Sequence, residues 1–417
     1  MQYQVQYGHG VLEIDIPQER LVGILAPNPV VPLTDIPGAV IAALHNPVGA
    51  SPLSILAHDK RSALVVTVDN TRPSPKALIH PVLDVLERQG IAVSVIIATG
   101  RHRQMTQDEL DAHLGRRIIR DCQVLQHDPF AEDRMIRCGT TERGTPITVN
   151  RAIFEHDLIV GCGVIEPSYL CGWSGGRKLM MPGLAHHASI DSNHFLLTEP
   201  GAVIGRLHGN PVSDDAAAFA RDLPYHFIVY AVSGPSDQVV SVIAGDPVLA
   251  HEKGCALCAP IYQVEPLHAD VIISSPGGWP YDLDLVQGKK AILPAISAVN
   301  PGGVIILCAE CPDGHGAEAT FTEWLLHKAP TEVVRDVRDR QQFNLGAHGA
   351  NILAKPIVEK GATVILVTCP SVAQSLRGSY IQAVSNLREA WQMAESVSGP
   401  HASVLCIEKA RRLITIS

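Results

Sequence analysis

The sequence lacks an apolar run that approaches the roughly 18 residues of a membrane span. Its first residues, Met1 to Gln4, lack the charged segment and the apolar segment of a secretion signal. Basic residues do not predominate, because the net charge is −9 and the isoelectric point is about 6.1. We therefore expect a cytoplasmic protein that binds neither a membrane nor nucleic acid.

Internal repeats and low-complexity segments are also lacking. The ten cysteines do not resemble a disulfide framework, since several of them, such as Cys308, lie inside apolar runs typical of strands. Two Cys-x-x-Cys pairs, one at Cys255 and Cys258 and one at Cys308 and Cys311, lie too far apart in the chain for a usual four-thiolate zinc site. We interpret the cysteines as reduced core residues.

The length of 417 residues predicts two domains, because a single core stops growing at about 250–300 residues. A Gly-Pro-Ser turn, a short strand and a helix ending near Cys258 precede position 265, where we place the boundary. Residues 1–265 are then an N-terminal cofactor-binding α/β domain. Residues 266–417 form a C-terminal α/β domain, whose last residues can pack back on the first domain. We expect the active site in the cleft between the domains.

Apolar, β-branched runs of strand length alternate along the chain with amphipathic helical stretches. This alternation is typical of largely parallel sheets covered by helices on both faces. The expected helices include residues 75–88 and 107–114. The expected strands are residues 63–68, 91–97, 156–160, 226–231, 270–274, 304–308, 363–368 and 403–407.

Polar side chains follow three of the predicted strands. Residues 69–73 read Asp-Asn-Thr-Arg-Pro, residues 99–103 read Thr-Gly-Arg-His-Arg, and residues 161–168 lead through Gly-Cys-Gly to Glu-Pro-Ser. Since ligands bind at the carboxyl ends of parallel strands, we expect these segments to converge on one cleft. Each segment alone is also compatible with an ordinary capped turn between a strand and a helix.

Residues 174–178 read Ser-Gly-Gly-Arg-Lys, and His194 follows sixteen positions after the lysine. Two adjacent glycines let the backbone approach a ligand, so N–H groups at a helix start can hold a phosphate while Lys178 reaches over it. The segment is not a nucleotide-triphosphate loop of the Walker type, because Gly176 is followed by Arg177. A different nucleotide-like cofactor is therefore expected.

The second half of the chain adds a turn at residues 276–282, followed by Gln287 and Lys290 on a predicted helix. A spacing of three residues places the amide and the ammonium on the same helical face, where both can hydrogen-bond a carboxylate. The alternative is an ordinary solvated face.

At these positions the sequence resembles the nickel-pincer-nucleotide lactate racemases and their 2-hydroxyacid racemase and epimerase relatives. The resemblance covers most of the chain, with the motifs in the same order. The matching segments are residues 69–73, 99–103, 126–128, 139–141, 144–146, 172–178, 193–194, 277–280 and 310–314.

The resemblance implies a nickel pincer nucleotide, nickel pyridinium-3,5-bisthiocarboxylate mononucleotide, which cofactor-synthesis proteins would supply. Lys178 would form the thioamide link to it, His194 would ligate nickel, and His102 would be a catalytic acid/base. The implied cofactor-binding residues are Asp69, Thr71, Arg72, Ser174, Gly175, Gly176 and Lys178. The implied substrate-binding residues are Arg72, Gln287 and Lys290. The implied catalytic residues are His102, Lys178, Ser168, Arg72 and Lys290.

The implied activity is inversion of C2 of a small 2-hydroxy acid, an isomerase reaction. The Cα–H of such an acid is weakly acidic, so loss of a hydride to an electron-poor pyridinium is an easier route than loss of a proton. A neutral imidazole near pH 7 can accept the hydroxyl proton. Arg72 and Lys290 would hold the carboxylate.

The sequence departs from the family at Ser168, where the lactate racemases carry a second catalytic histidine ten residues before the lysine. The second proton would then come from Ser168 through water, from Tyr169, or from His186 and His187. Val286 also stands where the family has a tyrosine.

These departures leave a sugar-acid (aldonate) 2-epimerase open as an alternative to a lactate racemase. A non-catalytic carrier of the nickel cofactor is the alternative from another class. A carrier would need only Lys178, His194 and the phosphate site, so the presence of His102, Arg72 and Lys290 counts against it.

Overall fold

The computed structural model describes residues 1–316, 318–339 and 344–416. They divide into two compact units, a central unit of residues 29–261 and a C-terminal unit of residues 1–28 and 262–417. Each unit contains a six-stranded sheet, so the expected two-domain α/β fold with largely parallel sheets is confirmed. None of the helices in the described residues is long and apolar enough to cross a membrane.

The division differs from the expected one at the start of the chain. We placed residues 1–265 together, whereas residues 1–28 belong with the C-terminal unit. The reason is strand pairing, because β3 (Leu21–Leu25) pairs in parallel with β19 (Val404–Ile407) at the edge of the C-terminal sheet. The last residues also stay in this unit, where β20 (Ile414–Thr415) pairs with β14 (Gln263–Val264).

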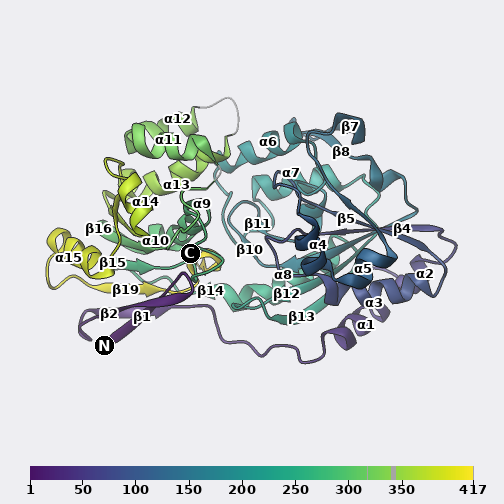
Figure 1. Ribbon diagram of the computed structural model, residues 1–417, viewed down its shortest axis with the longest axis horizontal. Coiled ribbons are helices and arrows are strands. Elements are labelled where there is room, and N and C mark those ends of the chain that lie inside the picture. Colours follow the sequence, from purple (N-terminus) through teal and green to yellow (C-terminus); the bar gives the residue numbers. More distant parts are fainter. Residues whose placement is uncertain (317, 340–343, 417) are drawn as a thin grey trace. The chain divides into compact units, whose positions relative to one another are not determined.

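The central unit has the strand order β13-β12-β9-β4-β5-β6, and all neighbours except β12 and β13 are parallel. Its elements in chain order (Figure 1) are α1 (Ile36–His45), α2 (Leu53–Leu56), β4 (Ser62–Thr67), α3 (Lys76–Glu87), β5 (Ala92–Ile97), α4 (Gln107–Leu114), α5 (Arg116–Asp121), β6 (Gln123–Gln126), η1 (Glu132–Arg134), β7 (Met135–Thr140), β8 (Pro146–Asn150), η2 (Arg151–Phe154), β9 (Leu158–Ile165), β10 (Pro167–Ser168), β11 (Gly172–Trp173), η3 (Gly176–Leu179), α6 (His187–Phe195), η4 (Leu196–Thr198), α7 (Pro211–Ala220), β12 (Phe227–Ser233), β13 (Val239–Gly245) and α8 (Leu249–Tyr262).

This strand order reverses between β4 and β9. The chain runs outward from β4 through β5 to β6, and then from β9 through β12 to β13 on the other side. Such a reversal is the usual ligand-binding position of an open α/β sheet, at the carboxyl ends of the strands. The polar segments after β4 and β9 therefore lie where an open α/β sheet usually binds its ligand.

One expected strand end is wrong. We ended the strand before Gly161, but β9 continues to Ile165 with every residue buried. Tyrosine side chains explain the two glycines, because a Cβ on Gly161 would lie 2.1 Å from the Tyr225 hydroxyl oxygen and one on Gly163 would lie 2.7 Å from Cε1 of Tyr230. These glycines make room for rings within a strand and do not mark a turn.

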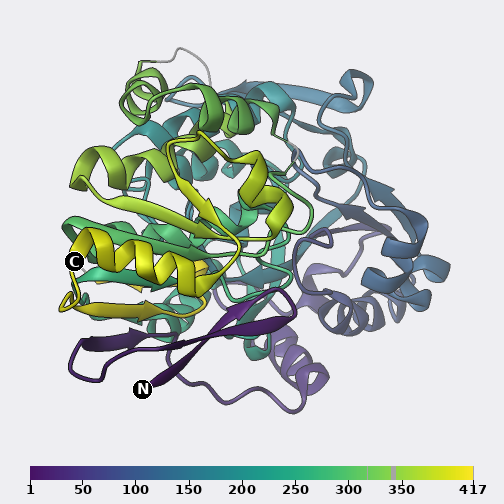
Figure 2. The same ribbon diagram turned by 60° about the vertical axis from the view of Figure 1, so that its left-hand side comes forward.

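The C-terminal unit has the strand order β18-β17-β16-β15-β19-β3, and all of these neighbours are parallel. The hairpin of β1 (Gln2–Tyr7) and β2 (Gly10–Asp15), purple in Figures 1 and 2, lies beside C-terminal elements drawn in yellow. The remaining elements are β15 (Ala269–Ser274), α9 (Leu285–Gly288), η5 (Lys289–Ala291), α10 (Ile292–Ala298), β16 (Val299–Cys308), α11 (Ala319–His327), α12 (Pro330–Arg338), α13 (Leu345–Lys360), β17 (Thr363–Val367), α14 (Pro370–Ser375), β18 (Gln382–Val384), α15 (Leu387–Ser398) and η6 (Ala410–Arg412).

The cysteines behave as expected. All ten are among the described residues, none forms a disulfide, and eight are buried. Cys308, for example, is fully buried at the end of β16. The role of the eight buried cysteines in the fold is core packing.

Candidate functional site

A histidine and a carboxylate that follow neighbouring strands form a close polar pair of the predicted site. Asp69 follows β4 and His102 follows β5, and the parallel pairing of these strands places both residues at one edge of the sheet. Nδ1 of His102 lies 2.6 Å from Oδ2 of Asp69. The Asp69 carboxylate is buried, whereas 56% of the His102 side chain is exposed.

Asp69 is held as a carboxylate by its partners. Thr71 donates to Oδ1 of Asp69 from both its backbone N–H, at 3.1 Å, and its hydroxyl, at 2.5 Å. Burial acts to raise the pKa of Asp69, but the hydrogen bonds from His102 and Thr71 and the charge of Arg72 outweigh it, so the pKa lies below its ordinary value. An ionised Asp69 accepts the proton on Nδ1 of His102, which leaves the lone pair of a neutral ring on Nε2.

Arg72 is anchored across the reversal of the sheet. Its Nε lies 3.2 Å from Oε1 of Glu166, which follows β9. The Glu166 side chain is 3% exposed and the Arg72 side chain is 29% exposed. Glu166 lies in the segment 161–168 that we expected to reach the cleft, but it was not named as a site residue. The pair joins the segments after β4 and β9 that we expected to converge.

The glycine-rich segment forms a tight loop after β11. Ser174 is buried, and its hydroxyl accepts the backbone N–H of Glu166 at 3.0 Å. Gly176 has a φ of +54°, and a Cβ there would lie 2.6 Å from Cγ of His251. The loop leads into η3, a short 3-10 helix, where we expected the start of a helix. Only glycine fits this backbone and this contact.

Lys178, the third residue of η3, contacts the position at which the sequence departs from the family. Its ammonium lies 3.4 Å from the Ser168 hydroxyl oxygen, a weak hydrogen bond in which lysine is the donor. The thiol of Cys171 lies 3.9 Å from the same oxygen. Both Ser168 and Lys178 are partly exposed. Ser168 therefore lies against the predicted attachment point of the cofactor.

His194 lies near the end of α6 and is 8% exposed. Its Nδ1 is 3.1 Å from the side-chain oxygen of Asn193. A histidine ligand usually donates a hydrogen bond from its other ring nitrogen, and a borderline metal such as nickel accepts imidazole nitrogen. The imidazole of His194 and the primary amine of Lys178 lie in the same unit, and both donor types fit the nickel nucleotide that the family resemblance implies.

The structure assigns His186 and His187 to other contacts. His186 caps α6, because its Nδ1 accepts the backbone N–H of Ala188, and its Nε2 contacts Glu132 at 2.9 Å. His187 stacks on Phe130 with 4.9 Å between the ring centroids. These two histidines and Glu132 also form a cluster whose ligand atoms lie within 4.8 Å of one another. A metal on Nε2 of His186 would require a proton on Nδ1 and would cost the helix its cap, so we interpret the cluster as structural.

The substrate-binding residues predicted in the second half form a pair in the C-terminal unit. The Lys290 ammonium donates to the amide oxygen of Gln287 at 2.5 Å, which agrees with their expected placement on one face. Asp284 caps α9 by accepting the backbone N–H of Gln287 at 2.7 Å. Lys289 points elsewhere, because it is 3% exposed and donates to the Val286 carbonyl at 2.6 Å.

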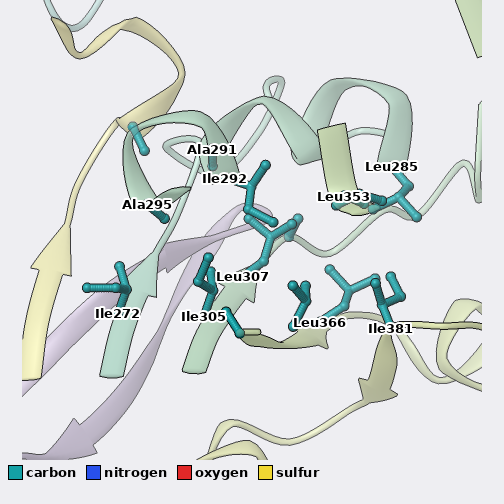
Figure 3. Close-up of a cluster of buried hydrophobic side chains, with 14 of the residues drawn as sticks. Ile272, Leu285, Ala291, Ile292, Ala295, Ile305, Leu307, Leu353, Leu366 and Ile381 are labelled. Atoms are coloured by element: carbon teal, nitrogen blue, oxygen red, sulfur yellow. The ribbon is translucent and has the colours of Figure 1, made fainter. Parts of the chain in front are cut away.

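The segment that carries Gln287 and Lys290 is pinned by apolar contacts. Leu285, Ala291 and Ile292 on either side of the pair are fully buried in the same cluster as Leu307 and Leu366. Figure 3 shows these side chains over the strands of the C-terminal sheet. The short helices are therefore fixed by the core, while the amide and the ammonium stay partly exposed.

The comparisons with known proteins agree along the whole chain. A family model described as the lactate racemase N-terminal domain matches residues 7–205, and one described as the lactate racemase C-terminal domain matches residues 264–414. The chain is 33% identical over 404 residues to a lactate racemase of Thermoanaerobacterium thermosaccharolyticum, with 94% of each protein covered. It is 31% identical over 285 residues to a lactate racemase of Lactiplantibacillus plantarum, with 67% of each covered.

Two solved structures are similar to the fold. The lactate racemase apoprotein from T. thermosaccharolyticum matches with a TM-score of 0.93 and 32% identity, and all of each chain is covered. A protein from Thermotoga maritima matches with a TM-score of 0.66 and 19% identity, covering 92% of this chain and 99% of that one. The second likeness concerns the fold alone.

Proposed function

Because the chain belongs to the lactate racemase family, we propose that it inverts C2 of a 2-hydroxy acid by hydride transfer to and from a nickel-pincer pyridinium nucleotide. The family relationship makes the chain an isomerase of the racemase type. It also removes the alternative of a non-catalytic carrier.

The observation that carries the proposal is the hydrogen bond of 2.6 Å between His102 and Asp69. Asp69 orients the ring and keeps the proton on Nδ1, so Nε2 of the exposed His102 side chain is the base for the hydroxyl proton of the substrate. The same nitrogen returns this proton when the hydroxyl group is restored. When bound, the pincer nucleotide supplies the acceptance and return of the hydride.

Charged and polar side chains bind the carboxylate of the substrate in this proposal. Arg72 offers a planar guanidinium whose orientation Glu166 fixes through Nε. Lys290 and Gln287 offer an ammonium and an amide that already contact each other. A carboxylate bound by such a group keeps C2 in place, which lowers the barrier by positioning.

Lys178 and His194 hold the cofactor in this proposal, Lys178 as a thioamide and His194 as a nickel ligand. The positive φ of Gly176 and the buried Ser174 shape the loop that presents Lys178. Asp69, Thr71, Arg72 and the loop of residues 174–176 complete the proposed cofactor-binding set.

Ser168 supports a substrate larger than lactate. A hydroxyl in place of an imidazole leaves volume and a hydrogen-bond partner beside Lys178 for a further polar group of the substrate. A site built to bind such a group discriminates against an acid that lacks it, because its polar atoms would lose their partner. Inversion of a 2-hydroxy acid with a further hydroxyl or carboxyl group is therefore the specific form of the proposal, and a sugar-acid (aldonate) 2-epimerase is the form in which the further groups are hydroxyls.

Two measurements test the proposal. Protein produced together with the cofactor-synthesis enzymes should contain about one nickel per chain, and His194→Ala should lose most of it. Unchanged nickel content in this variant would refute the role of His194. The loaded enzyme should then be incubated with D-lactate, malate and gluconate, and the products separated by chiral chromatography. Efficient racemisation of lactate with the larger acids untouched would refute the proposed substrate.

A further inference from the structure

A buried carboxylate accepts hydrogen bonds from three side chains, one of which belongs to Asn193, the residue before the proposed nickel ligand. Asp215 of α7 is 1% exposed. Its Oδ1 accepts the Thr141 hydroxyl at 2.5 Å, and its Oδ2 accepts the Thr145 hydroxyl at 2.8 Å and the Asn193 amide at 2.8 Å. A buried charge is tolerated when it is hydrogen-bonded in this way, and such a network is rigid.

The orientation of the Asn193 amide follows from its two acceptors. Its nitrogen donates to Asp215 and also to the backbone carbonyl of Val212 at 3.0 Å. An oxygen in that position would face two acceptors, so the NH₂ group must be there. The amide oxygen of Asn193 is therefore the atom that faces Nδ1 of His194 at 3.1 Å.

We infer that Asp215, acting through Asn193, fixes His194 in the tautomer that is protonated on Nδ1. A carbonyl oxygen can only accept, so Nδ1 of His194 must donate. A neutral imidazole has a single N–H, and its lone pair is then on Nε2, the form in which a histidine ligates a metal. Asp215 is a positioning residue for the proposed nickel site, and this inference rests on the proposed role of His194.

The tautomer can be measured without nickel. Nitrogen-15 NMR of the metal-free full-length protein, labelled at histidine and recorded near pH 8, distinguishes protonated from unprotonated ring nitrogens. The signal missing from His194→Gln identifies His194. We expect Nδ1 of His194 to be protonated and Nε2 to be unprotonated. The opposite tautomer, or an even mixture, would overturn the inference.

Substitutions test the role of Asp215. Asp215→Ala should release Asn193, mix the two tautomers of His194 and speed the transfer of nickel from the loaded enzyme to a chelator by about 10–100-fold. Asp215→Asn should keep the wild-type tautomer and most of the nickel retention. Its amide oxygen can serve the two donors at the Oδ2 position, while its NH₂ group faces the Thr141 hydroxyl, which can turn to accept.

Thr141→Val is the matched control, because it removes one donor to Asp215 and the acceptor of the Thr145 backbone N–H but leaves the contact with Asn193 in place. It should lower the stability of the protein without changing the tautomer or the nickel retention. If Asp215→Ala folds and keeps both the wild-type tautomer of His194 and the wild-type nickel retention, the inference is wrong. If Asp215→Ala does not fold, the wild-type spectrum and Asp215→Asn still decide.

The outcomes separate this inference from the proposed function. Retention of nickel by His194→Ala refutes the role of His194 as a nickel ligand, whatever the nitrogen-15 NMR spectrum shows. Loss of nickel by His194→Ala together with a wrong tautomer in the wild-type protein refutes only the role of Asp215.

Discussion

The partners of each imidazole decide what the histidines of the central unit can do. His102 contacts a carboxylate at one nitrogen and is largely exposed at the rest of its ring. His127 is fully buried between Ala185 and Asn150, and burial lowers its pKa to about 4, so its ring stays neutral and structural. Exposure with an anionic partner favours acid/base chemistry, and burial with neutral partners favours a role in packing.

Substitution of His102 by alanine should remove most of the activity and leave the cofactor in place. General acid–base catalysis contributes about 10²–10⁴-fold to a rate, so kcat should fall by this factor. Nickel content measured in the same preparation is the control, since His102 has no proposed role in holding the metal. Activity within a few-fold of the wild type would assign the proton transfer to another group.

Glu166→Gln should raise KM more than it lowers kcat. The substitution keeps the volume and one oxygen for Nε of Arg72 but removes the buried charge that holds the guanidinium, and a hydrogen bond between charged groups is about twice as strong as a neutral one. We expect KM to rise about tenfold, which corresponds to about 1.4 kcal/mol. Glu155→Gln, in an exposed ion pair with Arg151, is the matched control. A fall in KM would mean that the negative charge of Glu166 repels the substrate carboxylate, and it would contradict the proposed role of Glu166 in orienting Arg72.

At the scale of elements, the alternation of runs along the sequence predicted helices and strands well. The helix expected at residues 107–114 has these bounds in the structure, because Thr106 and Glu109 form a capping box and Gly115 ends it. The end of β9 could not be predicted, since the rings that occupy the space beside Gly161 and Gly163 come from Tyr225 and Tyr230, more than sixty residues away. Likewise, Asp215 carries no local signal of its contact with Asn193.

Helix α8 supports the glycine-rich loop through His251, and the burial of this ring makes the stability of the central unit depend on pH. The ring of His251 is 2% exposed, and its Nε2 contacts the carbonyl of Ser174 at 2.9 Å. Burial lowers the pKa of His251 to about 4, whereas the unfolded value is about 6.5. Between these values the unfolded chain binds more protons, so the free energy of unfolding rises with pH.

The contribution of His251 to the free energy of unfolding is complete above about pH 6.5. It is lost as the pH falls toward 4, by up to about 1.4 kcal/mol per pH unit. His251→Phe should flatten the pH dependence of stability in this window. Urea unfolding followed by pulse proteolysis at several pH values, with cleavage mapped to residues 29–261, measures the slope. An unchanged slope in the variant would show that His251 is not the group that titrates. His58→Phe is the control, because His58 is an exposed histidine of the same unit.

At the scale of the whole molecule, the chain crosses from one unit to the other and returns. Residues 1–28 join a sheet whose other strands begin after position 262. The sequence could not predict this, because β3 is a short run whose partner β19 lies almost four hundred residues later. The boundary near 265 followed from local turn signals, whereas the place of the N-terminus depends on a pairing with no local signal.

Deletion of residues 1–28 should therefore prevent the C-terminal unit from folding. The hairpin and the residue after it bury Tyr3, Val5, Ile14 and Ile16 against the sheet, each at 9% exposure or less. At about 1.5–3 kcal/mol for each side chain, their loss is about 6–12 kcal/mol, as large as the stability of a typical domain at about 5–15 kcal/mol. The deletion also removes β3 and exposes the edge of β19, which favours aggregation.

We expect a fragment of residues 262–417 to give a poorly dispersed NMR spectrum and to unfold without a cooperative transition. The same fragment with residues 1–28 attached after Ser417 through a flexible Gly/Ser linker should recover both, because the hairpin and β3 can then pair within one chain. A dispersed spectrum and a cooperative transition for residues 262–417 alone would mean that the sheet does not depend on the hairpin. In that case the boundary near 265 would describe the folding units better than the division at residue 28.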